Sequence, residues 1–118
     1  MEPTVETFDD VAVVEVNLDQ LDASNEDEFR RDMAPVLKDY HKIVLDLGRV
    51  QFVDSRGCGA ILSCLKQVSV GGGDLKLCRV TKPARTVFEL IRLHKICEIL
   101  PGREEAVRAF ASADKPQG

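Results

Sequence analysis

Hydrophobic residues recur along the chain with two different periods, one typical of strands and one typical of helices. A nearly continuous branched run at 43–47 predicts a central strand that is buried on both faces. From Cys58 onward the apolar residues fall every three or four positions, which is helical spacing. We therefore expect a strand, a tight connector and an amphipathic helix in succession, with the helix ended by the three glycines at 71–73.

The other elements follow from the same patterns and from turn and capping residues. Strands are predicted at 4–8, 11–16, 74–80 and 96–100, and helices from Ser24 or Asn25, from Thr81-Pro83 and from Glu104 to Ala111. Pro35 interrupts the first helix, which predicts a kink or a break near Met33. Strands that alternate with helices predict an α/β fold, a mixed sheet of about four to five strands with helices packed against it.

Length and composition fit one domain. A chain of 118 residues, 44% hydrophobic, can bury one core, which we place at about 4–111 with a frayed tail at 112–118. No apolar run approaches the roughly 20 residues that span a bilayer, and the acidic start lacks the features of a signal peptide. The sequence predicts a cytoplasmic protein without membrane insertion.

Cysteine and histidine spacing gives no support for a metal site. The four cysteines form no Cys-x-x-Cys pair, and the two histidines have no ligand spacing to them. We expect the cysteines to be small buried hydrophobic residues in a reducing compartment, and we expect neither a metal nor a cofactor.

Charge is unevenly distributed along the chain. The net charge is −4, yet residues 1–32 hold 11 acids and 2 bases. With one Tyr and no Trp, the chain lacks the basic face and aromatic platforms of a nucleic-acid-binding protein. The acidic start is either a solvated edge or a docking surface for a basic partner.

The best functional candidate is Ser55, in the sequence Asp54-Ser55-Arg56-Gly57 at the start of the central helix. Its hydroxyl is suited to capping that helix, which is one interpretation. A nucleophile elbow is excluded because Val53 stands where Gly-x-Ser-x-Gly requires glycine. A dinucleotide fingerprint fails at Leu62. His41 and His94 stay open as bases, but we expect no enzyme and no catalytic residue.

The whole stretch resembles the STAS domain of bacterial anti-sigma factor antagonists. The similarity lies in the strand at 43–47, in 50–55 with its Asp-Ser-x-Gly, and in 57–62. Leu18-Asp19 also matches a Gly-x-Leu-Asp pattern of the family, with Asn17 in place of the glycine. The resemblance covers roughly residues 11–110 and implies the STAS fold.

The resemblance also implies a function. Ser55 would be phosphorylated by an anti-sigma factor serine kinase; the unphosphorylated protein would bind that kinase and free a sigma factor, and a serine phosphatase would reset the switch. The expected partner-binding residues are Asp19, Asp22, Ser24, Asn25, Asp54, Ser55, Arg56, Gly57 and Cys58. An alternative is a constitutive STAS subunit of another assembly, such as a lipid-transport ABC complex or a stress-signalling complex.

Arg56 departs from the family, in which a small Ser or Thr is usual at this position. A cation in the first turn opposes the helix dipole at a cost of about 0.3–1 kcal/mol. The side chain could extend into water, or it could contact an acidic group on the kinase and so select that partner.

Overall fold

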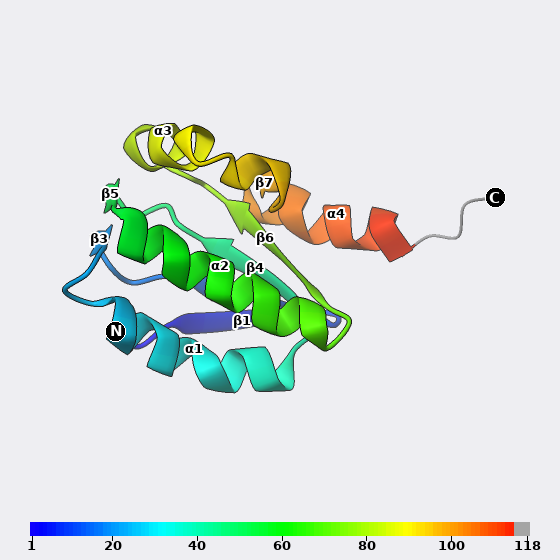
Figure 1. The fold of residues 1–118 in the computed structure, drawn as a ribbon. Helices are drawn as coiled ribbons and strands as arrows, with labels where there is room; N and C mark the ends of the chain where they lie inside the picture. The colour runs from blue at the N-terminus through cyan, green and yellow to red at the C-terminus, as the bar shows by residue number, and fades with distance from the viewer. Residues whose placement is uncertain (115–118) are drawn as a thin grey trace.

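Five strands form one mixed sheet in the order β1-β2-β4-β6-β7 in the computed structural model, which describes residues 1–114 (Figure 1). Strands β1 and β2 form an antiparallel hairpin, and the other neighbours are parallel. The predicted α/β architecture is confirmed. The sheet strands are β1 (Thr4–Phe8), β2 (Val11–Glu15), β4 (Lys42–Asp46), β6 (Asp74–Cys78) and β7 (Ile99–Leu100), and a separate parallel pair is β3 (Gln20–Leu21) with β5 (Phe52–Val53).

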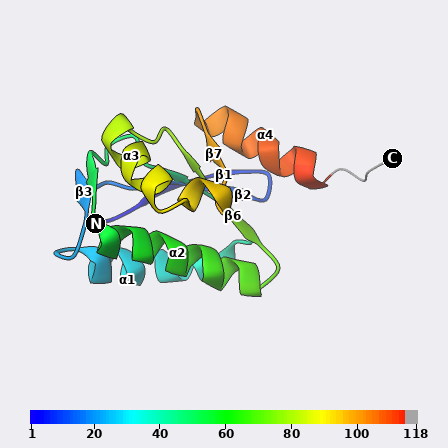
Figure 2. The ribbon, with the colours of Figure 1, turned by 45° about the horizontal axis from the view of Figure 1, so that its top comes forward.

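Helices cover both faces of this sheet. They are α1 (Glu26–Asp39), α2 (Ser55–Val70), α3 (Lys82–Leu90) and α4 (Arg103–Asp114), with a short 3-10 helix, η1 (Leu93–Lys95). Alternate residues of β2 show the two layers. Ala12 and Val14 belong to the larger core with α1, α2 and α3, whereas Val11 and Val13 pack with Phe110 of α4. Figure 2 shows α4 on the opposite side of the sheet from α1 and α2.

Of the predicted kink or break near Met33, the break is wrong. Helix α1 runs without interruption through Pro35, which is exposed. Proline lacks an N–H, so the carbonyl of Arg31 one turn earlier loses its helical partner. Arg31 is exposed too, and water can therefore satisfy that carbonyl at this surface.

Three boundaries differ from the prediction in the C-terminal half. Strand β6 ends at Cys78, two residues before the predicted Val80, because Arg79 has a positive φ of 54°. The last strand is only Ile99–Leu100, because Ile96 caps η1 and the N–H groups of Ile96 and Cys97 bond to the Leu93 carbonyl. Helix α4 continues to Asp114, three residues past the predicted Ala111. The rest of the predicted frayed tail, 115–118, lies outside the described residues.

All four cysteines are free and buried. Burial raises the pKa of Cys64 to about 11 and those of Cys78 and Cys97 to about 12. These thiols therefore stay protonated at neutral pH and fill the core as small hydrophobic groups, as predicted.

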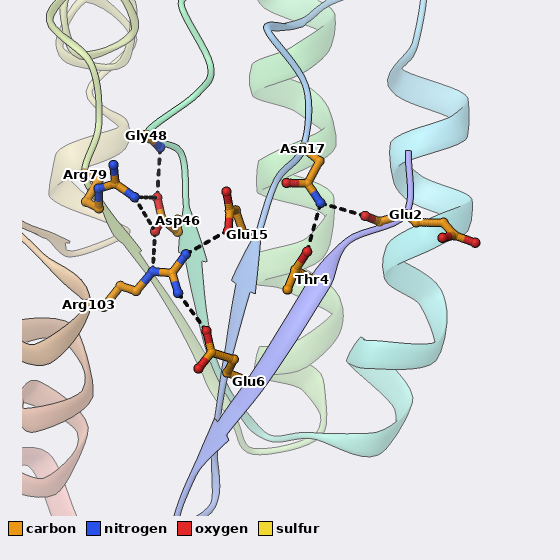
Figure 3. Close-up of polar contacts among 9 residues, drawn as sticks. All are labelled: Glu2, Thr4, Glu6, Glu15, Asn17, Asp46, Gly48, Arg79 and Arg103. Carbon is orange, nitrogen blue, oxygen red and sulfur yellow. Dashed lines mark hydrogen bonds and ion pairs between the residues drawn. The ribbon is translucent and has the colours of Figure 1, made fainter.

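Asp46, the last residue of β4, is the centre of an ion-pair network under α4 (Figure 3). Its side chain is fully buried and accepts from Arg103 Nε at 2.5 Å, Arg79 Nη1 at 3.1 Å and the Gly48 N–H at 2.9 Å. Burial acts to raise the pKa of Asp46, but the hydrogen bonds from Arg103, Gly48 and Arg79 outweigh it and hold that pKa below its usual value.

Arg103 extends the network to the hairpin. Its Nη1 and Nη2 atoms lie 3.1 Å from carboxylate oxygens of Glu6 and Glu15 respectively. A residue at the start of α4 is thereby tied to β1, β2 and β4 together, which fixes that helix on its face of the sheet (Figure 3).

Candidate functional site

Ser55 is the first residue of α2 and is exposed. Among residues 1–114 its hydroxyl forms no hydrogen bond. The interpretation of Ser55 as the helix cap is wrong, because the residue before it occupies the cap position. The hydroxyl is left free at the surface, at the end of a helix where backbone N–H groups point outward.

Asp54 is the N-cap of α2 and joins two segments of the chain. Its Oδ1 accepts from the Gly57 N–H at 2.9 Å, and its Oδ2 accepts from the Ala23 N–H at 3.1 Å. Hydrogen bonds from the backbone N–H of Gly57, and then that of Ala23, hold the pKa of Asp54 below its usual value. This carboxylate is therefore charged at neutral pH and links the start of α2 to the loop before α1.

That loop lies beside the start of α2 because β3 and β5 pair in parallel. Leu21 is opposite Val53, the Leu21 carbonyl accepts from the Asp54 N–H at 3.3 Å, and the Asp19 carbonyl accepts from the Gln51 N–H at 2.7 Å. The two segments in which we predicted partner-binding residues are thus brought together in space.

The loop is also cross-linked internally by its own polar side chains. Asp22 Oδ1 accepts from the backbone N–H and the hydroxyl of Ser24, at 3.0 and 2.5 Å. Asn25 occupies the N-cap position of α1 but makes no capping bond; its Oδ1 accepts from the Asp22 N–H, and its Nδ2 donates to the Gln20 carbonyl. Asn25 therefore starts α1 at one of the two predicted cap positions, but it supplies no side-chain cap, because its side chain, like that of Ser24, bonds within the loop.

The predicted partner-binding residues differ in accessibility. Asp19, Ser24, Ser55 and Arg56 are exposed, and Asp22, Asn25 and Asp54 are half-buried. Gly57 and Cys58 are buried, so their side-chain positions are not available to a partner. A Cβ on Gly57 would overlap the backbone carbonyl of Leu21, and this glycine therefore permits the close approach of α2 to β3.

Arg56 has an intramolecular partner that the sequence did not reveal. Its Nη1 lies 3.0 Å from Glu26 Oε1, and Glu26 Oε2 accepts from Arg30 Nε at 3.1 Å. The Arg56 side chain is 69% exposed, so it reaches the solvent as one alternative predicted, but it also pairs with Glu26, which neither alternative included; its contact with a kinase stays a prediction. Hydrogen bonding by Arg56, and then by Arg30, holds the pKa of Glu26 below its usual value despite burial.

Three residues near Ser55 were missed from the sequence. Arg30 follows Glu26 by four positions, a helical ion-pair spacing that could have been noticed. The contact between Glu26 and Arg56 joins residues that are 30 positions apart, so no local sequence pattern predicts it. Phe52 is 53% exposed beside this region, and an exposed aromatic side chain is a frequent anchor in interfaces.

Residues 1–114 contain neither a metal-binding cluster nor a membrane-spanning helix. There, no group of three or more His, Cys, Asp or Glu side chains is arranged to hold a metal ion. In the same part of the chain, no helix has both the length and the apolar character needed to cross a bilayer.

Comparison with known proteins decides the family. The STAS domain model matches residues 2–106. The chain belongs to the STAS domain family. Among its relatives are BtrV of Bordetella bronchiseptica, named as a candidate anti-sigma factor antagonist, at 32% identity over 94 residues, which is 79% of this chain and 81% of BtrV. The anti-sigma F factor antagonist of Paenibacillus polymyxa is 31% identical over 90 residues, 75% of this chain and 77% of that protein.

The solved structures agree with this assignment. The crystal structure of a candidate anti-sigma factor antagonist from Thermotoga maritima has a TM-score of 0.81 at 27% identity, over 91% of this chain and 92% of that one. The predicted resemblance to STAS-domain anti-sigma factor antagonists is confirmed, and so is the STAS fold.

Proposed function

We propose that this protein is an anti-sigma factor antagonist whose binding to an anti-sigma factor serine kinase is switched by phosphorylation of Ser55. The observation that carries the proposal is the free, exposed hydroxyl of Ser55, which stands at the start of α2 beside a rigid loop. Its membership of the STAS family, with relatives named as anti-sigma factor antagonists, supports the same function.

The unmodified surface is suited to binding a protein partner. Its backbone is fixed by Asp54 and by the loop hydrogen bonds, so little conformational entropy is lost on binding. Phe52 provides an apolar contact, and the exposed Asp19, whose carboxylate pairs with Arg49 at 3.5 Å, provides a polar one. In this state the protein occupies the kinase, and the sigma factor is released.

Phosphorylation changes the charge of this surface without requiring the protein to refold. The kinase transfers the γ-phosphoryl group of ATP to Ser55 Oγ, ADP leaves, and the hydroxyl proton passes to a base on the kinase. Free N–H groups and the dipole of α2 accommodate the new anion. A partner packed on Ser55 would have to bury nearly two added negative charges next to Asp54, which is costly, so the complex dissociates.

Two further parts of the cycle follow from this proposal. A serine phosphatase hydrolyses the phosphoserine and returns the protein to its binding form. Kinase, phosphatase and sigma factor act in the cytoplasm, which is where we place this protein. Its own role is to bind and be modified, with no catalytic residue.

The test is to incubate the protein with an extract of its source cells and ATP, and then to measure its intact mass. The wild type should gain the mass of one phosphoryl group, and Ser55→Ala should gain none. Ser69→Ala is the matched control, because Ser69 is an exposed serine near the far end of the same helix, and it should be modified like the wild type. A mass gain that persists in Ser55→Ala would contradict Ser55 as the acceptor, and no mass gain in the wild type would favour a constitutive binding subunit.

A further inference from the structure

Two arginines from different helices meet at the start of the seam between α1 and α2. These helices run side by side in the same direction, with their first turns adjacent (Figure 1). Arg30 of α1 and Arg56 of α2 both contact the carboxylate of Glu26, at 3.1 and 3.0 Å. Two cations therefore share one anion, and the cluster keeps a net positive charge.

Ser55 lies next to this cluster on the surface of α2. With about 100° per residue, Gly59 is rotated by only about 40° from Ser55 and about 60° from Arg56, so it lies between them one turn along. The Arg30 Nη2 atom is 3.9 Å from the position a Gly59 Cβ would occupy. The Arg30 guanidinium thus lies over α2 one turn beyond Ser55, on the same side of the helix.

Both guanidinium groups are reachable from the surface, whereas their shared anion is not. The side chains of Arg30 and Arg56 are 41% and 69% exposed, but that of Glu26 is only 9% exposed. Arginine binds phosphate oxygens through charge-assisted hydrogen bonds, which are stronger than bonds between neutral groups.

We infer that Arg30 and Arg56 form a binding site for the phosphoryl group on Ser55, with Glu26 as the counter-ion that positions both arginines in the unmodified protein. The inference rests on the proposed function, and it adds how the chain itself binds the phosphoryl group that regulates it. A phosphoserine dianion competes with Glu26 for Arg56 and draws on the remaining donors of Arg30. The phosphoryl group is then held toward the α1–α2 seam, where both arginines favour its doubly ionised form.

Charged groups of several elements face this phosphoryl group and act in opposite directions. Arg30 and Arg56 lower its second pKa, whereas Asp54 on the adjacent cap, Glu26 on α1 and Asp22 on the loop raise it. An isolated phosphoserine has a second pKa of about 6. The effect of the arginines on this second pKa is therefore measured by comparing the wild type with variants that lack one of the charges.

The experiment uses the full chain with phosphoserine incorporated genetically at position 55, so that no kinase is needed. The second pKa of the phosphoryl group is measured by phosphorus NMR titration. Arg30→Gln and Arg56→Gln should each raise that pKa by about half a unit, roughly a threefold change in proton affinity. Glu26→Gln should lower it, because both arginines are then released to the phosphoryl group.

Arg31→Gln is the matched control, since Arg31 is exposed on α1 and lies about 140° around the helix from Glu26, and it should leave the pKa unchanged. Opposite shifts for the arginine and glutamate variants cannot come from a general loss of folding. Equal pKa values in the wild type, Arg30→Gln and Arg56→Gln would overturn the inference, and so would an equal shift in Arg31→Gln. Failure of a kinase to modify Ser55 would contradict the proposed function but would leave this titration unaffected.

Discussion

Asp46 is the last residue of β4 and Asp54 comes directly after β5, so both carboxylates stand at the ends of parallel strands, yet their surroundings differ. Asp46 is fully buried, and two guanidinium groups and one backbone N–H bond to it under α4. Asp54 is half-buried, and its carboxylate accepts from backbone N–H groups of α2 and of the loop before α1. The first carboxylate is itself buried and neutralises two partly exposed guanidinium groups, and the second fixes the backbone around an accessible serine.

The proposed function requires a domain that is both stable and switchable, and this difference meets that requirement. Charges around Asp46 are mutually compensated in a covered site, so a change there leaves an ion without its partner. Around Ser55 the backbone is fixed by hydrogen bonds, but the hydroxyl itself has no partner within residues 1–114. Charge can be added at Ser55 without breaking an interaction that holds the fold together.

The largest effect should come from Asp46→Asn. It removes the negative charge between Arg79 and Arg103, while Arg103 keeps Glu6 and Glu15 and the side chain of Arg79 is 52% exposed. We expect a loss of about 3 kcal/mol in the free energy of unfolding, the low end for breaking a buried ion pair. Denaturant unfolding measures it, with exposed Asp19→Asn as a control that should change stability by less than about 0.5 kcal/mol.

Gly57 and Gly59 of α2 test how closely the start of this helix must pack against β3. Gly57→Ala would place a Cβ against the backbone carbonyl of Leu21 and push α2 away from β3, at a cost of about 1–3 kcal/mol. Gly59→Ala, two residues later in the same helix, meets only the end of Arg30 at 3.9 Å and should be neutral or stabilising by up to about 1 kcal/mol. Thermal unfolding that gave the two variants the same stability would show that this close contact has no role.

The contribution of Asp46 to stability can be measured from the pH dependence of the free energy of unfolding. The pKa of Asp46 is lowered by folding, so its contribution is fully present above the ordinary Asp pKa of about 3.9 and is lost as the pH falls through the lower folded value. The wild type should therefore lose more stability than Asp46→Asn between about pH 5 and pH 2. Parallel stability curves for the two proteins over that range would contradict this account.

The smallest effect is expected for the stability of Ser55→Ala. Because Asp54 and not Ser55 caps α2, the substitution removes no hydrogen bond made within residues 1–114. The free energy of unfolding should change by less than about 0.5 kcal/mol. A larger loss in urea unfolding would mean that the hydroxyl has a structural role.

Most of the fold could be predicted because it depends on local patterns. The branched run at 43–47 gave the central strand, the helical spacing after Cys58 gave α2, and the glycines at 71–73 ended that helix. Such periodicities depend on which side of an element is buried, which is encoded within each segment.

The polar contacts could not be predicted because they join distant segments. Asp54 and Ser55 are both good capping residues, and only the position of the Ala23 N–H, 31 residues away, shows which of them points inward. Arg56 meets Glu26 across 30 residues, and Asp46 meets Arg103 across 57. The candidate site could therefore be proposed from the sequence, while the intramolecular partners of its charged side chains could not.

The most direct test of the central claim is the affinity of the cognate kinase for this protein with and without phosphate on Ser55, measured by calorimetry alongside the folding of both forms. The account predicts equal circular dichroism spectra, and binding at least about tenfold weaker for the phosphorylated form and for Ser55→Asp, which corresponds to roughly 1.4 kcal/mol. Equal affinities of the modified and unmodified proteins would contradict it, as would weaker binding that came with loss of the fold.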